Sequence, residues 1–441
     1  MKKLYTIPAA FLASSLFLTG CAGFQTGNNN DSSAENEEGK VVLDFWTFWG
    51  SEIRRPVIEK IITDFNESQD EIEVQHTYLP WGDIWTKELA AIAAGDPPDV
   101  VINDINATAL RGEQNQAMNL SEFLAEDDIS DQFYPELWDA TLYEGDSYGI
   151  PFNTDTRVLF YNKDAFEEAG LDPEQPPTTW DELEEYAAKL DVKNGDDYER
   201  IGFYPLWGIN YDVWMLNANG HNFINEDNEV LIDTETNLET LEWLKGWQDK
   251  YGDDVINSYK AQIDSQQGNP FFNGSLGMYV SAPTFYTQIR DYADDLNFGV
   301  AKLPEMEPGN GHTSWGGGFV AEIPAGASNP EASYEFIKYL TGAEAQEYWA
   351  VQNFDNVANI EAAESAAQSD EFTEDGTMVY SMATEYMSDT LLTPVPVSAP
   401  DFMGSVNPKI DEVFLGSKTP KQALEEAQAD VESLVEKNTR E

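Results

Sequence analysis

The order of strands and helices between residues 41 and 102 constrains the fold most strongly. Apolar alternation predicts strands at 41–46 and 72–76, and a continuous apolar run predicts another at 99–102. Helical periodicity predicts a helix from about Pro56 and a second helix at 83–94. This alternation of strands and helices implies an α/β fold, with a parallel sheet joined by right-handed crossovers.

A second long pattern runs from Tyr148 to Leu190. The apolar run at 158–161 predicts a strand buried on both faces, and a short helix at 164–169 follows it. Gly170 then ends this helix in the left-handed conformation, which glycine adopts without steric cost. Thr179 is expected to cap the next helix, and a glutamate three residues later predicts a capping box.

The charge balance is strongly acidic. The chain of 441 residues has 24 Lys and Arg against 81 Asp and Glu, a formal net charge of −57. Such a surface repels nucleic acid, so no nucleic-acid partner is expected. The acidic residues are spread along the whole chain, which favours the hypothesis of a host living in high salt. The alternative is an acidic surface that gathers a ligand.

The amino-terminal residues have the pattern of an export signal. Residues 1–21 contain a basic start, a short apolar run and the sequence Leu-Thr-Gly-Cys, which is similar to a lipobox. We expect Cys21 to be lipidated and to anchor the protein to the membrane, on the cell surface or in the periplasm. An ordinary secretory cleavage site is the alternative. Residues 22–39 are polar and acidic, which predicts a flexible tether.

Metal and disulfide chemistry find little support in the sequence. Cys21 is the only cysteine, so no internal disulfide is expected. The three histidines, His76, His221 and His312, lie far apart without the spacing of metal ligands. We therefore expect no metal site and no cofactor.

Several motifs carry a resemblance to a known family, the bacterial extracellular solute-binding proteins of carbohydrate ABC transporters, in the maltose-binding-protein group. The motifs cover nearly all of the chain after the tether. They are Gly95–Val100, Tyr148–Pro151, Asn153–Arg157, Tyr161–Lys163, Thr179–Leu183, Phe272–Met278, and Trp315–Gly318 with Ala343–Gln346.

The resemblance implies a two-lobe periplasmic-binding-protein-like fold with a three-crossing hinge. We place the crossings near Pro151, near Leu303–Pro304 and near Val351–Gln352. Lobe 1 would then consist of residues 40–151 plus 304–351, and lobe 2 of residues 152–303 plus 352–441. The ligand would lie in the cleft between the lobes.

A sugar site needs flat aromatic faces together with carboxylate and amide groups. Candidate residues therefore come from loops at the expected mouth, from the first crossing, and from positions that match the family pattern. The aromatic and glycine candidates are Trp49, Trp81, Trp207, Tyr211, Phe285, Trp315, Gly317 and Phe402. The polar candidates are Asp83, Asn103, Asp104, Asn153 and Asp155. Asn103 stands where the maltose-binding pattern has a tryptophan, so the sugar specificity is not carried over.

The expected function is a lipid-anchored receptor that captures a sugar or oligosaccharide. It would deliver this ligand to the permease subunits of an ABC importer. We expect no catalytic residues, because the chain has no Gly-x-Ser-x-Gly motif, no Walker loop and no dinucleotide-binding loop. A secreted glycoside hydrolase and a receptor for a peptide or an osmolyte are the alternatives.

We predict that salt stabilises this protein, because counterions relieve the repulsion among its carboxylates. The melting temperature should be higher in molar sodium chloride than in dilute buffer, as measured by circular dichroism. Equal melting temperatures in the two buffers would contradict the high-salt hypothesis.

Overall fold

The computed structural model describes residues 39–195, 197–263 and 268–439. The expected export signal at 1–21, the expected lipidation site Cys21 and nearly all of the expected tether at 22–39 lie outside these described residues. Within the described part of the chain, no helix has the length and apolar character needed to cross a membrane.

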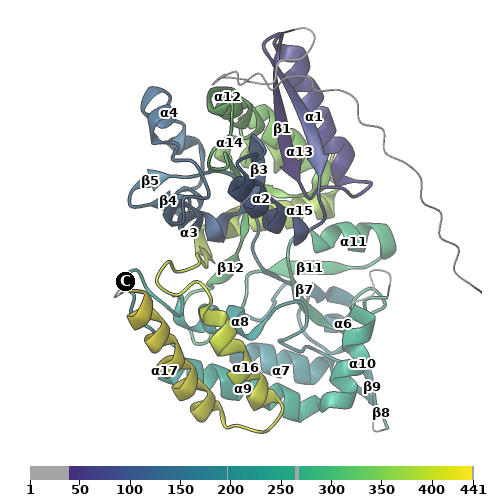
Figure 1. Ribbon diagram of the computed structural model, residues 1–441. Helices are drawn as coiled ribbons and strands as arrows, with labels where there is room; N and C mark the ends of the chain where they lie inside the picture. The colour runs from purple at the N-terminus through teal and green to yellow at the C-terminus, as the bar shows by residue number, and fades with distance from the viewer. Residues whose placement is uncertain (1–38, 196, 264–267, 440–441) are drawn as a thin grey trace, which may run out of the picture.

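A six-stranded sheet and its helices form the upper half of the molecule in Figure 1, which we call lobe 1. The strand order is β14-β6-β13-β3-β1-β2. The strands are β1 (Val41–Thr47), β2 (Ile72–Tyr78), β3 (Val100–Asp104), β6 (Ile150–Thr154), β13 (Gly318–Glu322) and β14 (Asn356–Val357). β1 pairs in parallel with β2 and β3, which confirms the parallel arrangement predicted from the sequence. β13 runs antiparallel to β3 and β6.

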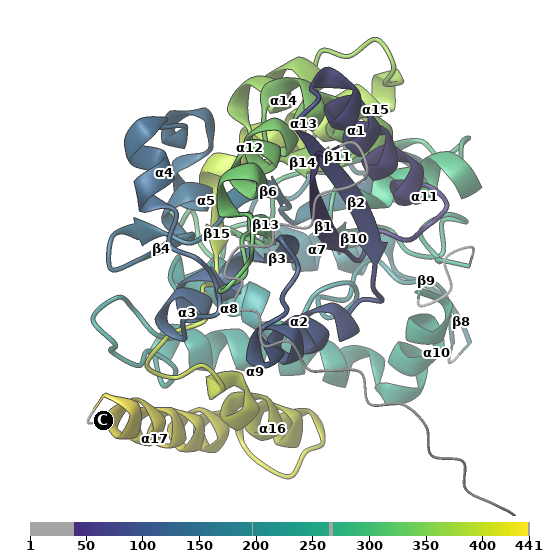
Figure 2. The same ribbon diagram turned by 45° about the horizontal axis from the view of Figure 1, so that its top comes forward.

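Helices pack around this sheet, as Figures 1 and 2 show. They are α1 (Arg54–Ser68), α2 (Asp83–Ala94), α3 (Thr108–Glu113), α4 (Ser121–Glu126), α5 (Pro135–Asp139), α12 (Pro330–Leu340), α13 (Ala343–Asn353), α14 (Ile360–Ala366) and α15 (Glu374–Tyr386). Phe336 joins strand and helix layers, since its ring centroid lies 5.1 Å from those of both Phe45 and Phe65. Side chains from β1, α1 and α12 therefore share one core.

A three-stranded antiparallel sheet and its helices form the lower half, which we call lobe 2. The strand order is β10-β7-β11, with β7 (Val158–Asn162), β10 (Met278–Ser281) and β11 (Phe298–Ala301). Every residue of β7 is buried, which confirms the buried strand predicted there. The helices of lobe 2 are α6 (Lys163–Glu168), α7 (Trp180–Leu190), α8 (Tyr211–Asn219), α9 (Glu235–Tyr251), α10 (Asp253–Ile263), α11 (Phe285–Tyr292), α16 (Phe402–Phe414) and α17 (Pro420–Asn438).

Short elements complete the described chain. Two hairpins are formed by β4 (Leu142–Tyr143) with β5 (Asp146–Ser147), and by β8 (Val192–Asn194) with β9 (Asp197–Arg200). Single 3-10 turns lie at η1 (Ile105–Ala107), η2 (Ser130–Gln132) and η3 (Met387–Asp389).

The start of α7 shows how local sequence sets a helix boundary. The Thr179 hydroxyl accepts a hydrogen bond from the backbone N–H of Glu182 at 3.2 Å, as predicted. The Glu182 carboxylate instead accepts from the N–H of Thr178 at 2.8 Å, one residue earlier than in a capping box. Trp180 follows at once and stacks on Trp243, with ring centroids 4.1 Å apart. The cap thus directs a buried tryptophan into the core of lobe 2.

The chain passes between the two sheets through three segments, which we call the switch segments. β6 leads into β7 through residues 155–157. β11 returns to β13 through β12 (Ser314–Gly316), and α15 leads to α16 through β15 (Thr390–Leu392). β12 and β15 pair in parallel, so the second and third switch segments lie side by side.

Each switch lies further along the chain than the sequence analysis placed it. Pro151 lies inside β6, so the first switch comes only after Thr154. Residues beyond Pro304 still contact lobe 2, where the Glu305 carbonyl accepts from the N–H of Trp180 at 2.9 Å. α13 continues past Gln352, and β14 then pairs with β6 of lobe 1. The sequence shows where a strand ends, but not which sheet the next segment joins.

Buried hydroxyl groups connect the three switch segments. Thr156 Oγ1 donates a hydrogen bond to Ser314 Oγ at 2.9 Å and lies 2.6 Å from Thr390 Oγ1. Ser314 Oγ also accepts from the backbone N–H of Arg157 at 2.9 Å. All three hydroxyl residues are buried. Since a buried polar group without a partner is costly, these contacts hold the switch segments together.

A buried ion cluster lies inside lobe 1. Arg111 Nε lies 2.6 Å from Glu322 Oε2, and its Nη2 lies 2.5 Å from Glu88 Oε1. Asn103 Nδ2 donates to Glu322 Oε2 at 2.8 Å. Burial raises the pKa of Glu88 to about 7, although the charge of Arg111 opposes this shift. The side chains of the cluster come from α2, α3, β3 and β13, so the cluster holds two helices and two strands of lobe 1 together.

We predict that Arg111→Met strongly destabilises the protein. The substitution leaves two carboxylates buried without their cation, and removal of one partner from a buried ion pair typically costs about 3–5 kcal/mol. The free energy of unfolding would be measured by urea denaturation. Arg290→Met is the matched control, because Arg290 forms an exposed ion pair with Asp291 and its loss should cost less than about 1 kcal/mol. Equal losses for the two variants would contradict the structural role of the cluster.

Candidate functional site

Four aromatic side chains form an exposed cluster at the edge of lobe 1, which we call the aromatic platform. It consists of Phe48, Trp81, Trp85 and Phe319. The ring centroids of Phe48 and Trp81 are 4.7 Å apart, and those of Trp81 and Trp85 are 4.8 Å apart. Phe319 adds a ring 4.8 Å from Phe48. The rings meet edge to face, and Trp81, which is 59% exposed, presents apolar surface to solvent above three half-buried rings.

The platform lies at the edge where the parallel strands of lobe 1 end. Phe48 directly follows β1, and Phe319 on β13 pairs with Asp104, the last residue of β3. In Figure 1, α2 and the end of β3 lie on the side of lobe 1 that faces lobe 2. The aromatic platform and the Asp104 carboxylate are therefore neighbours at the edge where ligands of parallel sheets bind.

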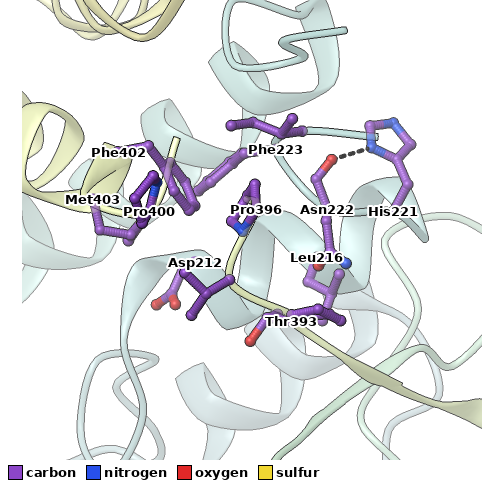
Figure 3. Close-up of a pocket in the computed structure, with 13 residues that line it drawn as sticks. Asp212, Leu216, His221, Asn222, Phe223, Thr393, Pro396, Pro400, Phe402 and Met403 are labelled. Carbon is purple, nitrogen blue, oxygen red and sulfur yellow. Dashed lines mark hydrogen bonds between the residues drawn. The ribbon is translucent and has the colours of Figure 1, made fainter. Parts of the chain in front are cut away.

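Lobe 2 contributes a pocket of about 170 Å³, shown in Figure 3, which we call the 393–403 pocket. It lies between α8, the loop that follows α8, and the segment 393–403 after the third switch. Phe402 and Met403 supply apolar walls, and Thr393 supplies a hydroxyl. Figure 3 shows Asp212 at the end of this pocket away from His221.

A second pocket of about 430 Å³ lies beside the switch segments, and we call it the Trp315 pocket. Arg157, Trp207 and Trp315 line it, and Asp212 lines it as well as the 393–403 pocket. The indole N–H of Trp315 donates to the hydroxyl of Thr393 at 3.1 Å. The two pockets thus adjoin through Asp212 and through this hydrogen bond.

An ion pair stands at the first switch segment. Arg157 Nη1 donates to Asp155 Oδ2 at 2.8 Å, and its guanidinium lies 4.4 Å from the ring centroid of Trp315. The other carboxylate oxygen of Asp155 accepts from the N–H of Gly317 at 2.9 Å. Both carboxylate oxygens of Asp155 therefore already accept hydrogen bonds from the protein. We infer that Asp155 mainly connects the chain segments between the lobes and has little capacity left to bind a ligand.

Two further carboxylates are partly buried nearby. Burial raises the pKa of Asp104, and the charge of Asp155 raises it further, against a hydrogen bond from the N–H of Asn106. Burial also raises the pKa of Asp212. Asp212 Oδ1 is buried and has no hydrogen-bond partner in the described part of the chain. Both groups could accept hydrogen bonds from a polyhydroxylated molecule.

Two of the predicted site residues lie in the interior of lobe 1. Trp49 is 1% exposed, and its ring centroid lies 4.3 Å from that of Trp349. Asn103 is 1% exposed and belongs to the ion cluster around Arg111. The expectation that they face a ligand is wrong, because each side chain points toward the helices that cover the sheet.

Three more predicted residues are occupied by internal contacts. Phe285 is 4% exposed, with its ring centroid 5.0 Å from that of Tyr279. Asn153 donates to Asp355 at 2.9 Å and accepts from the N–H of Phe319 at 3.0 Å, so both its amide nitrogen and its amide oxygen are engaged inside the protein. Gly317 is buried, and its N–H and carbonyl both bond within the switch segments.

The glycines after Trp315 serve the chain itself. Gly318 has φ +151°, and a Cβ there would lie 2.2 Å from the carbonyl oxygen of Asn153. A Cβ on Gly316 would lie 2.7 Å from the carbonyl oxygen of Asp155. These glycines allow β6 and the first switch segment to approach closely.

Of the remaining predicted residues, Trp207 and Tyr211 lie at or near the two pockets of lobe 2, and Asp83 lies near the aromatic platform of lobe 1. Trp207 is 2% exposed and stacks on Tyr259, with ring centroids 5.2 Å apart, so it forms a fixed wall of the Trp315 pocket. The Tyr211 hydroxyl donates to Asn407 at 2.6 Å, which ties α8 to α16. Burial raises the pKa of Tyr211. Asp83 is exposed in the first turn of α2, close in the chain to the aromatic platform.

Several residues of the site were not predicted. Phe48 and Phe319 of the platform, and Arg157, Asp212 and Thr393 of the pockets, are absent from the candidates drawn from the sequence. A signal was present for Phe48, since the alternation of β1 continues past its end and places Phe48 and Trp49 on opposite faces. The residues that the structure describes contain no group of His, Cys, Asp and Glu arranged to hold a metal ion.

We predict losses of stability of very different size for Trp49 and Trp81, although both were candidate ligand residues from the sequence. Trp49→Ala should lower the free energy of unfolding by about 3–5 kcal/mol, because it empties a packed aromatic core. Trp81→Ala should cost less than about 1 kcal/mol, because that ring is exposed. Urea denaturation measures both values. A larger loss for Trp81→Ala than for Trp49→Ala would contradict the assignment of core and platform.

Comparison with known proteins gives a consistent result. A sequence model of the family described as bacterial extracellular solute-binding protein matches residues 60–379. The arabinooligosaccharide-binding protein of Bacillus subtilis strain 168 is 23% identical over 445 residues, covering 93% of this chain and 95% of that protein. The sn-glycerol-3-phosphate-binding periplasmic protein UgpB of Salmonella typhimurium strain LT2 is 25% identical over 422 residues, covering 88% and 91%. The structure of CpMnBP1 with mannotriose bound is similar with a TM-score of 0.76 and 27% identity, covering 89% of this chain and 100% of that chain.

Proposed function

The chain belongs to the bacterial extracellular solute-binding proteins, and we propose that it captures a sugar or oligosaccharide between its lobes and delivers it to an ABC importer. The family and its sugar-binding relatives support a solute-binding protein of the ABC transporter type. The two-lobe fold expected from the sequence is confirmed by its structural relatives. These relatives are binding proteins, which favours a receptor over a glycoside hydrolase.

One observation carries the sugar assignment. A partly exposed aromatic platform lies where β3 of lobe 1 ends, and Asn106, two residues past Asp104, accepts a hydrogen bond at 3.2 Å from the N–H of Thr393 in the 393–403 pocket of lobe 2. Asp104 lies beside the platform, and Asp212 lines the pockets. A sugar offers flat C–H faces to an aromatic ring and hydroxyl donors to a carboxylate. Trp81 and Asp104 would contact the ligand from lobe 1, while Phe402, Trp315 and Asp212 would contact it from lobe 2.

Ligand capture would couple to a rotation of the lobes. Contacts made with both lobes at once exist only when the lobes are close, so the ligand stabilises the closed state. The switch segments are joined by the hydroxyl contacts of Thr156 and would remain together during this rotation. The permease subunits of the importer would then bind the closed form.

The place of this receptor in the cell follows from its amino terminus. The export signal at 1–21 would direct the chain out of the cytoplasm, and the extracellular character of the family supports export. Lipidation of Cys21 would hold the protein at the membrane. The tether at 22–39 would give the two lobes freedom to reach the permease.

A thermal-shift screen of the full-length protein tests this function. The panel contains mono-, di- and trisaccharides, polyols, peptides and glycine betaine, in molar salt. A ligand that binds only the folded state adds roughly 2.7 kcal/mol of stability at a hundredfold excess over its dissociation constant. We expect one class of sugar to raise the melting temperature and to be recovered intact by chromatography.

Two results would contradict the proposal. Recovery of a cleaved sugar would make the protein a glycoside hydrolase. If only peptides or glycine betaine raise the melting temperature, the protein is still a solute receptor, but its ligand is not a sugar.

A further inference from the structure

Three carboxylates approach the proposed binding site from different parts of the fold. Asp104 ends β3 of lobe 1, Asp155 lies in the first switch segment, and Asp212 lies in the first turn of α8 in lobe 2. Asp104 and Asp155 are close enough for the charge of one to raise the pKa of the other. Asp212 lines both pockets of lobe 2. A ligand between the lobes would therefore meet negative charge on each side.

Arg157, the basic residue beside Asp155, already has partners within the protein. Arg157 Nη1 donates to Asp155 at 2.8 Å and also to the carbonyl of Thr156 at 2.8 Å, while Trp315 covers its planar face. Lys260 also lines the Trp315 pocket and has a contact partner of its own. An anionic ligand would have to compete with these contacts for a cation.

The 393–403 pocket differs from the Trp315 pocket in the charged residues that line it. Its described lining contains no lysine and no arginine, and His221 is its basic residue, with Nδ1 2.9 Å from the carbonyl oxygen of Asn222. Neither Asp104 nor Asp212 forms an ion pair with a residue that the structure describes, although burial raises the pKa of Asp212 and the charge of Arg157 acts to lower it. Asp212 Oδ1 remains buried without a hydrogen-bond partner among the described groups. Since Asp212 lines both pockets, hydroxyl donors of a ligand can offset the cost of burying its carboxylate.

We propose that Asp212 is a specificity-determining residue, which makes the site select uncharged solutes rich in hydroxyl groups over anionic solutes such as sugar phosphates and uronates. This inference rests on the proposed receptor function. Hydroxyl groups of a neutral sugar donate to the carboxylate of Asp212, which lines both pockets, and Asp104 offers acceptors from the opposite lobe. A phosphate or a uronate carboxylate would instead place a second negative charge beside these groups, without an available cation to offset it.

The relatives show why the distinction matters. One relative is named for an arabinooligosaccharide, which is neutral, and another for sn-glycerol 3-phosphate, which is anionic. Overall similarity, at 23% and 25% identity, does not separate these two classes. The local balance of charge around Asp212 favours the neutral class.

A charge series of probes tests the inference with the full-length protein at a single salt concentration. The neutral probes are mannotriose, arabinotriose and maltotriose, and the anionic probes are sn-glycerol 3-phosphate and trigalacturonate. Isothermal titration calorimetry measures each affinity. We expect at least one neutral probe to bind, and both anionic probes to bind at least tenfold more weakly than the tightest neutral probe.

Asp212→Asn isolates the carboxylate, because it keeps the shape of the side chain and removes its charge. This variant should bind the tightest neutral probe at least tenfold more weakly, and the difference in affinity between neutral and anionic probes should become smaller. The melting temperature without ligand should not fall, since a buried charge is removed. Asp104→Asn is a second variant, in lobe 1, and it should change the affinities for the probes in the same direction.

Asp401→Asn is the matched control. Asp401 is exposed and precedes Phe402, so this variant removes one negative charge beside the 393–403 pocket without altering its lining. Its affinities should equal those of the unmodified protein.

The outcomes separate this inference from the function on which it rests. If an anionic probe binds as tightly as any neutral probe, the selectivity is wrong while the receptor function stands. If Asp212→Asn and Asp104→Asn change affinity no more than Asp401→Asn does, the role of the carboxylates is wrong. If no sugar binds while a peptide or glycine betaine does, the sugar assignment and this inference fail together.

Discussion

The hydrogen bonds among Thr156, Ser314 and Thr390 are the constraint on which the two-lobe arrangement depends. Each hydroxyl lies on a different switch segment and is buried, so separation of the segments would leave polar groups without partners. Gly318 tightens the same region, because only a residue without Cβ fits against the carbonyl of Asn153. The proposed rotation of the lobes would therefore take place about the switch segments, while the segments stay together.

The same segments also shape the binding site. Arg157 and Trp315 belong to the first and second switch segments, and they form one wall of the Trp315 pocket. The ion pair of Arg157 with Asp155 neutralises the cation that a bound anion would need. The geometry that joins the lobes thus also determines which charge a ligand meets, which connects the hinge to specificity.

Lobe 1 supports its half of the site through the buried ion cluster. Glu88 lies on α2, as does Trp85 of the aromatic platform, and Asn103 directly precedes Asp104 on β3. Glu322 lies on β13, the strand that carries Phe319. Arg111 draws these three elements together, so the positions of the platform and of Asp104 depend on charges that no ligand touches. Neither abundance nor burial alone identifies a ligand-binding carboxylate in so acidic a chain, since Glu88 and Glu322 are buried in the ion cluster. Asp212, proposed to contact the ligand, differs from them because it lines both pockets of lobe 2.

The sequence by itself determined the strands and helices around the first sheet and the buried strand at 158–161, because the period of apolar residues reflects local backbone geometry. The family motifs added the two-lobe fold and included Trp315, the wider family pattern added Phe402, and the ends of the predicted parallel strands indicated the loop at Trp81. Only the tertiary structure decided that Trp49 and Asn103 point inward and that the lobes meet at residues 155–157, 314–316 and 390–392. The physical reason is the range of the contacts: Asn103 bonds to Glu322, and Thr156 to Thr390, across more than two hundred residues. These partners meet only when whole lobes pack together, and the local pattern of apolar residues in the sequence does not predict that packing.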